Sequence, residues 1–143
     1  MKHLYFLFLF LITSISYAET TYICNYEKKP NSKQVYEIKE NKLYIDNEFV
    51  QTKSLKVNKL ISEFEYEYYL TSINDIPVSV DDKSTYFIQK GLRRHKVDLR
   101  TGVGFEINDY LQTNYGMKDG MIKNSFSRTV QSILSCNGFS INK

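Results

Sequence analysis

The chain lacks most of the residues that catalytic and metal sites require. Beyond residue 18 it has one histidine, His95, and its two cysteines, Cys24 and Cys136, lie far apart. One histidine excludes two-histidine chemistry, and neither cysteine has a second Cys or a His nearby in the sequence. The aspartates at 81–82 and 119 lack the alternating oxygen ligands of a calcium loop. We therefore expect no metal and no cofactor.

A long hydrophobic run is also missing. The longest, Leu4 to Ile12, has nine residues, whereas a membrane-spanning helix needs roughly 20. Lys2 precedes this run and the small residues Ser16 and Ala18 follow it, which is the layout of a cleavable secretory signal. We predict a signal peptide at 1–18 and a single secreted β-rich domain at 19–143, in the periplasm or extracellular space. We expect no integral membrane segment after cleavage.

A large excess of one charge is absent. Without Lys2 the chain has 18 basic and 16 acidic residues, which is too small an imbalance to predict nucleic-acid binding. The two cysteines are the remaining constraint, and an oxidising compartment predicts a disulfide between Cys24 and Cys136. Closing so long a loop would constrain the unfolded chain by up to about 4 to 5 kcal/mol.

The residues that are present favour strands. From Leu60 to Ser72, aromatic and aliphatic side chains alternate with Glu63, Glu65 and Glu67, which is typical of a half-buried strand. Shorter β-branched and aromatic runs, separated by polar turns, extend the pattern over 35–39, 42–46, 49–57, 86–90, 95–99 and 103–107. Gly102 suits a tight turn because it adopts positive φ without steric cost. The pattern predicts an all-β antiparallel meander that forms a barrel or a barrel-like sandwich.

Two segments are harder to interpret. Residues 108–124 contain Gly116 and Gly120 and only scattered apolar residues, so we expect a long loop there. Residues 126–136 fit a strand or one short C-terminal helix. We prefer the strand, because a disulfide to an N-terminal strand forms most easily from a neighbouring strand.

The densest charge cluster is the best candidate for a binding site. It contains Arg93, Arg94, Lys96 and Arg100. On a strand, Arg94, Lys96 and Arg100 share one face, whereas His95 shares the other with Val97 and Leu99. Such a row could bind an anionic partner. The alternative is internal: Glu63, Glu65 and Glu67 form a matching acidic row that could pair with it across the sheet.

Two further functions are compatible with the residues. Glu65, His95 and Arg93 could act as base, acid and phosphate ligand on adjacent strands of a nuclease-like enzyme. Alternatively, a barrel lined by Phe64, Tyr66 and Tyr68 could carry a small apolar molecule.

Thr21-Tyr22-Ile23-Cys24, Tyr86-Phe87-Ile88-Gln89-Lys90-Gly91 and the closing Cys136 are faintly similar to bacterial periplasmic inhibitors of c-type lysozyme. That resemblance implies a small disulfide-bridged barrel. The Ser-Gly-x-x-Tyr element of those inhibitors is missing, because the corresponding stretch, 66–72, reads YEYYLTS. No functional residue therefore carries over.

Taken together, the residues favour binding over catalysis. We expect a monomeric or weakly associating secreted binding protein whose partner is an envelope or extracellular protein or an anionic polymer. We expect no nucleic-acid partner. The tentative binding residues are Arg93, Arg94, Lys96 and Arg100.

Overall fold

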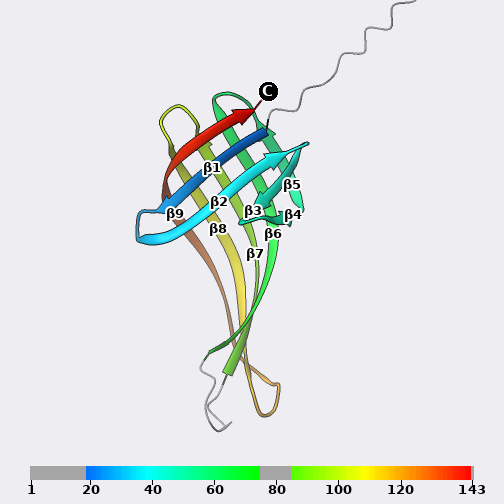
Figure 1. The fold of residues 1–143 in the computed structure, drawn as a ribbon. Helices are drawn as coiled ribbons and strands as arrows, with labels where there is room; N and C mark the ends of the chain where they lie inside the picture. The colour runs from blue at the N-terminus through cyan, green and yellow to red at the C-terminus, as the bar shows by residue number, and fades with distance from the viewer. Residues whose placement is uncertain (1–18, 75–84, 143) are drawn as a thin grey trace, which may run out of the picture.

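The computed structural model describes residues 19–74 and 85–142, and these form an antiparallel sheet of nine strands without a helix (Figure 1). The strands are β1 (Glu19–Tyr26), β2 (Lys29–Lys39), β3 (Lys42–Ile45), β4 (Glu48–Val50), β5 (Thr52–Val57), β6 (Ile61–Asn74), β7 (Thr85–Asp98), β8 (Val103–Gly116) and β9 (Ile122–Asn142). The predicted all-β meander is confirmed.

The sheet curls into a nearly closed barrel. The strand order is β4-β3-β2-β1-β9-β8-β7-β6-β5, so β1 to β4 and β5 to β9 each pair in chain order, β1 joins β9, and β4 and β5 are the two end strands. The two ends of the sheet approach each other where β3 contacts β5. Every pairing is antiparallel, which permits the short turns of the sequence.

Those turns have the backbone conformations that their residues favour. Glu40, Asn41, Asp46 and Asn47 all have positive φ, as tight hairpin turns require. Gly102 has a φ of 72° and accepts a hydrogen bond from the backbone N–H of Cys136. An added Cβ at Gly102 would clash with that strand, so glycine is required there for both conformation and space.

Alternate residues of each strand face the barrel interior. The largest fully buried side chains are Tyr22, Tyr36, Phe64, Leu43, Leu134 and His95. The expected parity of the strand from Leu60 is confirmed, because Phe64 and Tyr66 are buried inside. Aromatic rings fill this part of the barrel, and the Phe64 and His95 rings stack with centroids 4.4 Å apart. The core is therefore packed through ring contacts.

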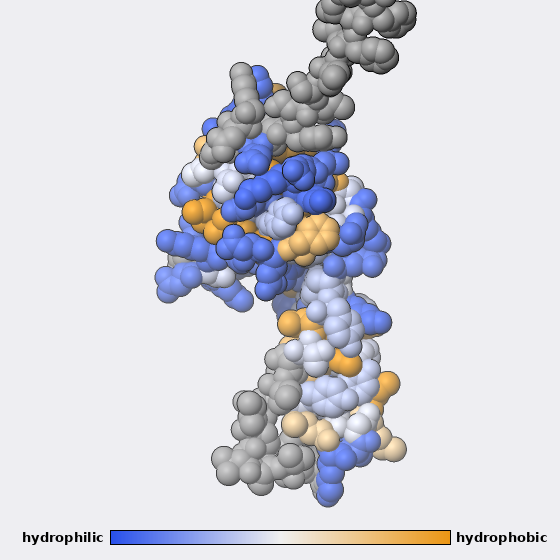
Figure 2. Space-filling view, turned by 45° about the vertical axis from the view of Figure 1, so that its right-hand side comes forward, coloured by the Kyte–Doolittle hydropathy of each residue, from blue (hydrophilic) through white to orange (hydrophobic). Residues whose placement is uncertain are grey.

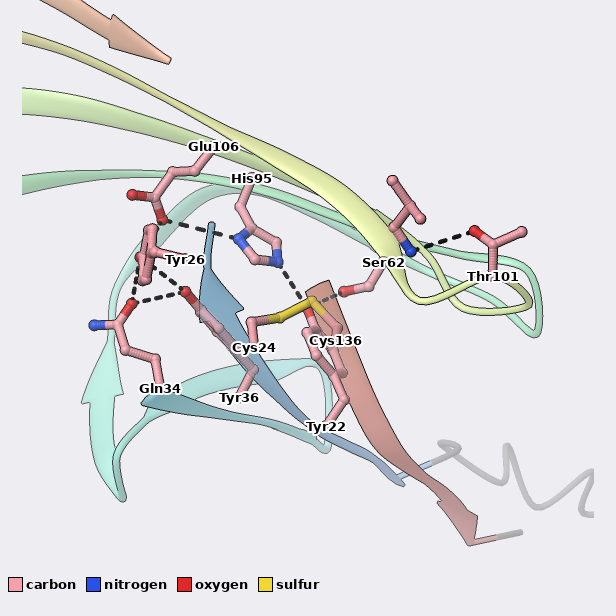
Figure 3. Close-up of a disulfide and its surroundings, with 11 residues drawn as sticks. Tyr22, Cys24, Tyr26, Gln34, Tyr36, Ser62, His95, Thr101, Glu106 and Cys136 are labelled. Atoms are coloured by element: carbon pink, nitrogen blue, oxygen red, sulfur yellow. Dashed lines mark hydrogen bonds and ion pairs between the residues drawn. A yellow bond between two sulfur atoms is a disulfide. The ribbon is translucent and has the colours of Figure 1, made fainter. Parts of the chain in front are cut away.

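A disulfide joins the first and last strands. Cys24 and Cys136 are bonded, and they lie opposite each other in the β1–β9 pair (Figure 3). Because this pair is the one sheet contact between strands distant in sequence, the predicted disulfide links the two halves of the barrel wall. The strand interpretation of 126–136 is confirmed, and the helix alternative is wrong.

Four strands continue beyond the barrel as a narrow extension (Figure 1). We define the extension as residues 67–74 of β6, 85–92 of β7, 109–116 of β8 and 122–130 of β9. The expected long loop at 108–124 is wrong, because β8 runs to Gly116 and a short turn leads into β9 at Ile122. The loop was predicted because glycines and polar residues dominate this segment. They are tolerated because this sheet has no packed core to fill.

Candidate functional site

Two neighbouring strands place charged side chains at one end of the barrel interior, and we call this end the floor of the site. Arg93 on β7 and Glu106 on β8 both project inward. Arg93 Nε lies 3.8 Å from Glu106 Oε1, which is an ion-pair distance and too long for a hydrogen bond. The Glu106 side chain is 7% exposed and that of Arg93 is 27% exposed. A charged pair therefore lies where the barrel interior meets solvent.

Neighbouring side chains hold the guanidinium in place. Arg93 donates from Nη1 to the Tyr66 hydroxyl at 3.2 Å and lies 4.8 Å from the centre of the Tyr68 ring. The Tyr68 ring occupies the space that a side chain at Gly91 would need. Burial disfavours the charged form, but Tyr66 and Glu106 outweigh it and raise the pKa of Arg93. Arg93 is therefore a permanent cation.

One donor of this cation is not used. Arg93 Nε is buried and has no hydrogen-bond partner among the described residues. His95 Nδ1, 3.9 Å from Glu106 Oε2, is likewise buried and unpartnered. Buried polar atoms without partners are uncommon and call for an explanation. Here both atoms are directed at the same carboxylate.

Tyrosines complete the floor (Figure 3). Tyr26 Oη lies 2.6 Å from Gln34 Oε1 and 3.1 Å from Glu106 Oε2, and its one proton serves one acceptor at a time. Tyr36 also donates to Gln34, at 2.8 Å. Burial raises the pKa of Tyr26 and of Tyr36, so both hydroxyls stay protonated.

A cleft opens above this floor at the point where β1 and β9 separate. β1 pairs with β9 as far as Tyr26 and Leu134, and then β1 turns away into β2 while β9 enters the extension. We call this branching point the fork and the hollow beside it the fork cleft. The fork cleft measures about 610 Å³. Its walls are Tyr26 to Lys29, Ser32 and Gln34 on one side, Val130 to Ile133 on the other, with Arg93, Glu106 and Asn108 below.

The rim of the fork cleft carries cations without partners. Lys28 and Lys29 are exposed, and neither forms an ion pair within 19–74 and 85–142. Glu27 is the one acidic residue of the rim, because Glu106 lies in the floor against Arg93. The entrance is therefore net positive.

The predicted binding residues lie on two faces. Arg93 faces the fork cleft, whereas Arg94 and Lys96 lie on the other face of β7 and Arg100 lies in the turn that follows β7. Arg94 pairs with Asp109, Lys96 with Glu63 at 3.4 Å, and Arg100 with Asp98 at 2.7 Å. Arg100 holds the pKa of Asp98 at about 2. All three cations are thus paired with carboxylates. Glu63 belongs to the acidic row that the sequence suggested, whereas Asp109 and Asp98 do not.

The hypothetical enzyme site is not assembled. Glu65 follows Phe64 and precedes Tyr66, both of which are buried, so its side chain lies on the outer parity. His95 is buried inside the barrel. The carboxylate near His95 is Glu106 instead. Across the described part of the chain, no group of His, Cys, Asp and Glu residues could hold a metal ion.

Sequence reasoning missed Glu106, Tyr26 and the Lys28–Lys29 pair. Glu106 comes near His95 only through the β7–β8 register, in which the two residues are opposite each other. Two adjacent lysines where a turn meets a strand were a usable signal, since such places expose charged side chains and often carry binding residues.

Comparison with known proteins adds no function to this site. No family model matches the chain, and no curated protein or solved structure shows significant similarity to it. Within the described ranges, no helix has the length and apolar character needed to cross a membrane. Any functional conclusion must therefore come from the site itself.

Proposed function

We propose that this chain is a secreted binding protein and that the fork cleft takes a polar, anionic ligand from the envelope or the extracellular space. The observation that carries the proposal is the fork cleft itself, whose entrance carries the exposed side chains of Lys28 and Lys29. Concave sites with a few convergent polar groups are the usual form of ligand sites.

Charge favours an anion. Lys28 and Lys29 are exposed at the entrance without an ion pair to any described residue, and Arg93 lies below them. A carboxylate or phosphate entering between them would gain charge-assisted hydrogen bonds from the lysines, and the Arg93 cation below would attract it. Glu106 stays paired with Arg93 and limits how deeply an anion can enter.

The other two functions lack a favouring observation. The side chains expected to line an apolar carrier, Phe64 and Tyr66, are packed against other rings. The residues expected to form an enzyme site lie on opposite faces of the sheet. Export through a signal peptide at 1–18 is part of the proposal, and the Cys24–Cys136 disulfide is consistent with an oxidising compartment.

Charge reversal at the rim tests the proposed site. The full chain is expressed with its own N-terminus, recovered oxidised, immobilised and exposed to envelope extract. Reversing both rim charges, with Lys28→Glu and Lys29→Glu, should abolish capture of any ligand that the unaltered protein retains. Bound material should also be released by salt, because exposed charges are screened.

Arg94→Gln is the matched control, because Arg94 is next to Arg93 in sequence but lies on the other face. It should capture the same ligand as the unaltered protein. Equal capture by the rim variant would contradict the site, and no capture by any form would contradict the binding function. Arg93 itself is left intact, since its loss would leave the buried Glu106 carboxylate without its permanent cation and destabilise the fold.

A further inference from the structure

One long edge of the sheet is open beside the fork cleft. β1 pairs with β9 from Leu134 onward, and the last backbone contact on that side is Glu27 N–H to Ile133 O at 3.1 Å. Below it, β9 pairs with β8 on one side, and no other described strand pairs with its residues 122–132. Unpaired strand edges are templates for a further strand.

The backbone groups that face this edge follow from alternation. In an antiparallel sheet, successive residues direct N–H and C=O to opposite neighbours. Ile133 O bonds toward β1, whereas Cys136 N–H bonds to Gly102 O on the other side. The β8–β9 register has no shift between Ser135 and Asn124. The N–H and C=O groups of Ser125, Ser127, Thr129 and Gln131 therefore point to the open edge.

Side chains around the edge are unusual for an exposed strand. β9 contains no proline, and residues 121–129 are all exposed. Among them are Met121, Ile122 and Phe126, the last 41% exposed. Figure 2 shows apolar and weakly polar surface on the extension, whereas much of the barrel surface is strongly hydrophilic. Proteins usually block open edges with prolines, bulges or charged side chains, and in this stretch of β9 the charged residues are Lys123 and Arg128.

We infer that the ligand of the fork cleft is an extended polypeptide segment, which pairs antiparallel with the open edge of β9 and places an acidic residue at Lys28 and Lys29. This inference rests on the proposed function. Such a segment continues the line of β1, so its first residues lie at the fork and the rest follow β9 toward Ile122. Backbone hydrogen bonds supply general affinity, and the fork cleft supplies selectivity.

Charge argues for a partner protein over pairing between the β9 edges of two copies. β9 has Lys123 and Arg128 but no Asp or Glu between Ile122 and Asn142. The β9 strand of a second copy therefore cannot present an acidic group to the fork in any register. A segment of another protein with an aspartate or glutamate near its start meets both requirements.

A displayed library of random peptides, long enough to span 123–131, tests the inference on the full-length exported protein. We expect enrichment of β-branched sequences with an acidic residue near the start. A synthetic peptide from that set should bind Ser127→Pro about tenfold more weakly, because proline removes one edge N–H donor. Ser127→Ala, which keeps that donor, should bind normally.

Hydrogen exchange gives a readout that depends on no variant. The peptide should slow exchange at the amides of Ser125, Ser127, Thr129 and Gln131 in the unaltered protein. Replacing its acidic residue with glutamine should weaken binding several-fold, and the rim variant should bind both peptides equally.

Three results would overturn the inference. The first is a set of enriched peptides without β-branched sequences, and the second is a peptide affinity that Ser127→Pro leaves unchanged. The third is concentration-dependent dimerisation of the protein that Ser127→Pro abolishes. The last result would identify a second copy as the occupant. If the rim variant loses envelope capture while Ser127→Pro retains it, the proposed function stands and the edge pairing fails. If the rim variant keeps capture, the proposed function itself fails.

Discussion

His95 shows how strongly its surroundings constrain a single residue. Its ring stacks on Phe64, and its Nε2 lies 3.2 Å from the Tyr22 hydroxyl. Burial lowers its pKa below the usual value of 6.5, and the nearby Glu106 offsets this only in part. His95 is therefore a core residue whose surroundings favour the neutral imidazole.

The lowered pKa of His95 predicts a pH-dependent stability. Below about pH 6.5 the unfolded chain binds a proton that the folded protein does not bind. The free energy of unfolding should therefore be fully retained above pH 6.5 and fall on acidification, by at most about 1.4 kcal/mol per pH unit. Urea unfolding between pH 7.5 and 5 measures this slope, and His95→Gln should reduce it. An unchanged slope in that variant would assign the acid sensitivity to other groups.

β9 is the element that connects the barrel, the fork cleft and the extension. Its C-terminal part is paired on both sides and carries the disulfide, whereas residues 122–132 pair with β8 and with no other described strand. β9 thus has one part with a paired strand on each side and another part with a paired strand on one side. The first belongs to the stable barrel, and the second offers backbone groups for binding.

Amide exchange of the unliganded protein tests this division of β9. Exchange in the extension should alternate, with Phe126, Arg128 and Val130 protected by β8 and Ser125, Ser127, Thr129 and Gln131 exposed to solvent. NMR of the monomer gives each rate separately. The amides of Ser135 and Asn137 face β1 and serve as internal controls that should be protected. Uniform protection along β9 would mean that another segment covers the open edge.

The whole molecule is a barrel whose wall is completed by a contact between its ends in sequence. β1 and β9 meet across a sequence separation of 112 residues at the Cys24–Cys136 bond. Without this pair, the β1–β4 strands would be joined to the rest of the sheet only through the chain connection and the β3–β5 contact. The disulfide therefore stabilises the β1–β9 pairing, and the fork lies at the end of that pairing.

Loss of the disulfide should destabilise the entire domain. Replacing both cysteines with Cys24→Ala and Cys136→Ala should lower the free energy of unfolding by up to about 4 to 5 kcal/mol, measured by urea unfolding. The unaltered protein in reducing agent should unfold at a similar urea concentration. Equal free energies of unfolding for the oxidised protein and the double variant would contradict a stabilising role of the disulfide between β1 and β9.

Much of the fold could be predicted because alternation along a strand is a local property. The strand from Leu60, the turn at Gly102 and the buried position of His95 all followed from neighbouring residues. The β8 and β9 strands of the extension could not be predicted in this way, since Asn108 to Gly116 and Ile122 to Ser125 lack the alternation that a packed core imposes. Their strand conformation comes from pairing with neighbours, which overrides weak local preference.

The sequence by itself determined an all-β chain, its meander of tight turns, its disulfide partners and the face on which each charge of β7 lies. Only the tertiary structure decided which charges meet. Register brought Glu106 to Arg93 and His95, gave Arg94 and Lys96 carboxylate partners on neighbouring strands, and left Lys28 and Lys29 without an ion pair among the described residues beside the fork cleft. The physical reason is range: side-chain parity depends on adjacent residues, whereas cross-strand neighbours depend on pairings between distant parts of the chain.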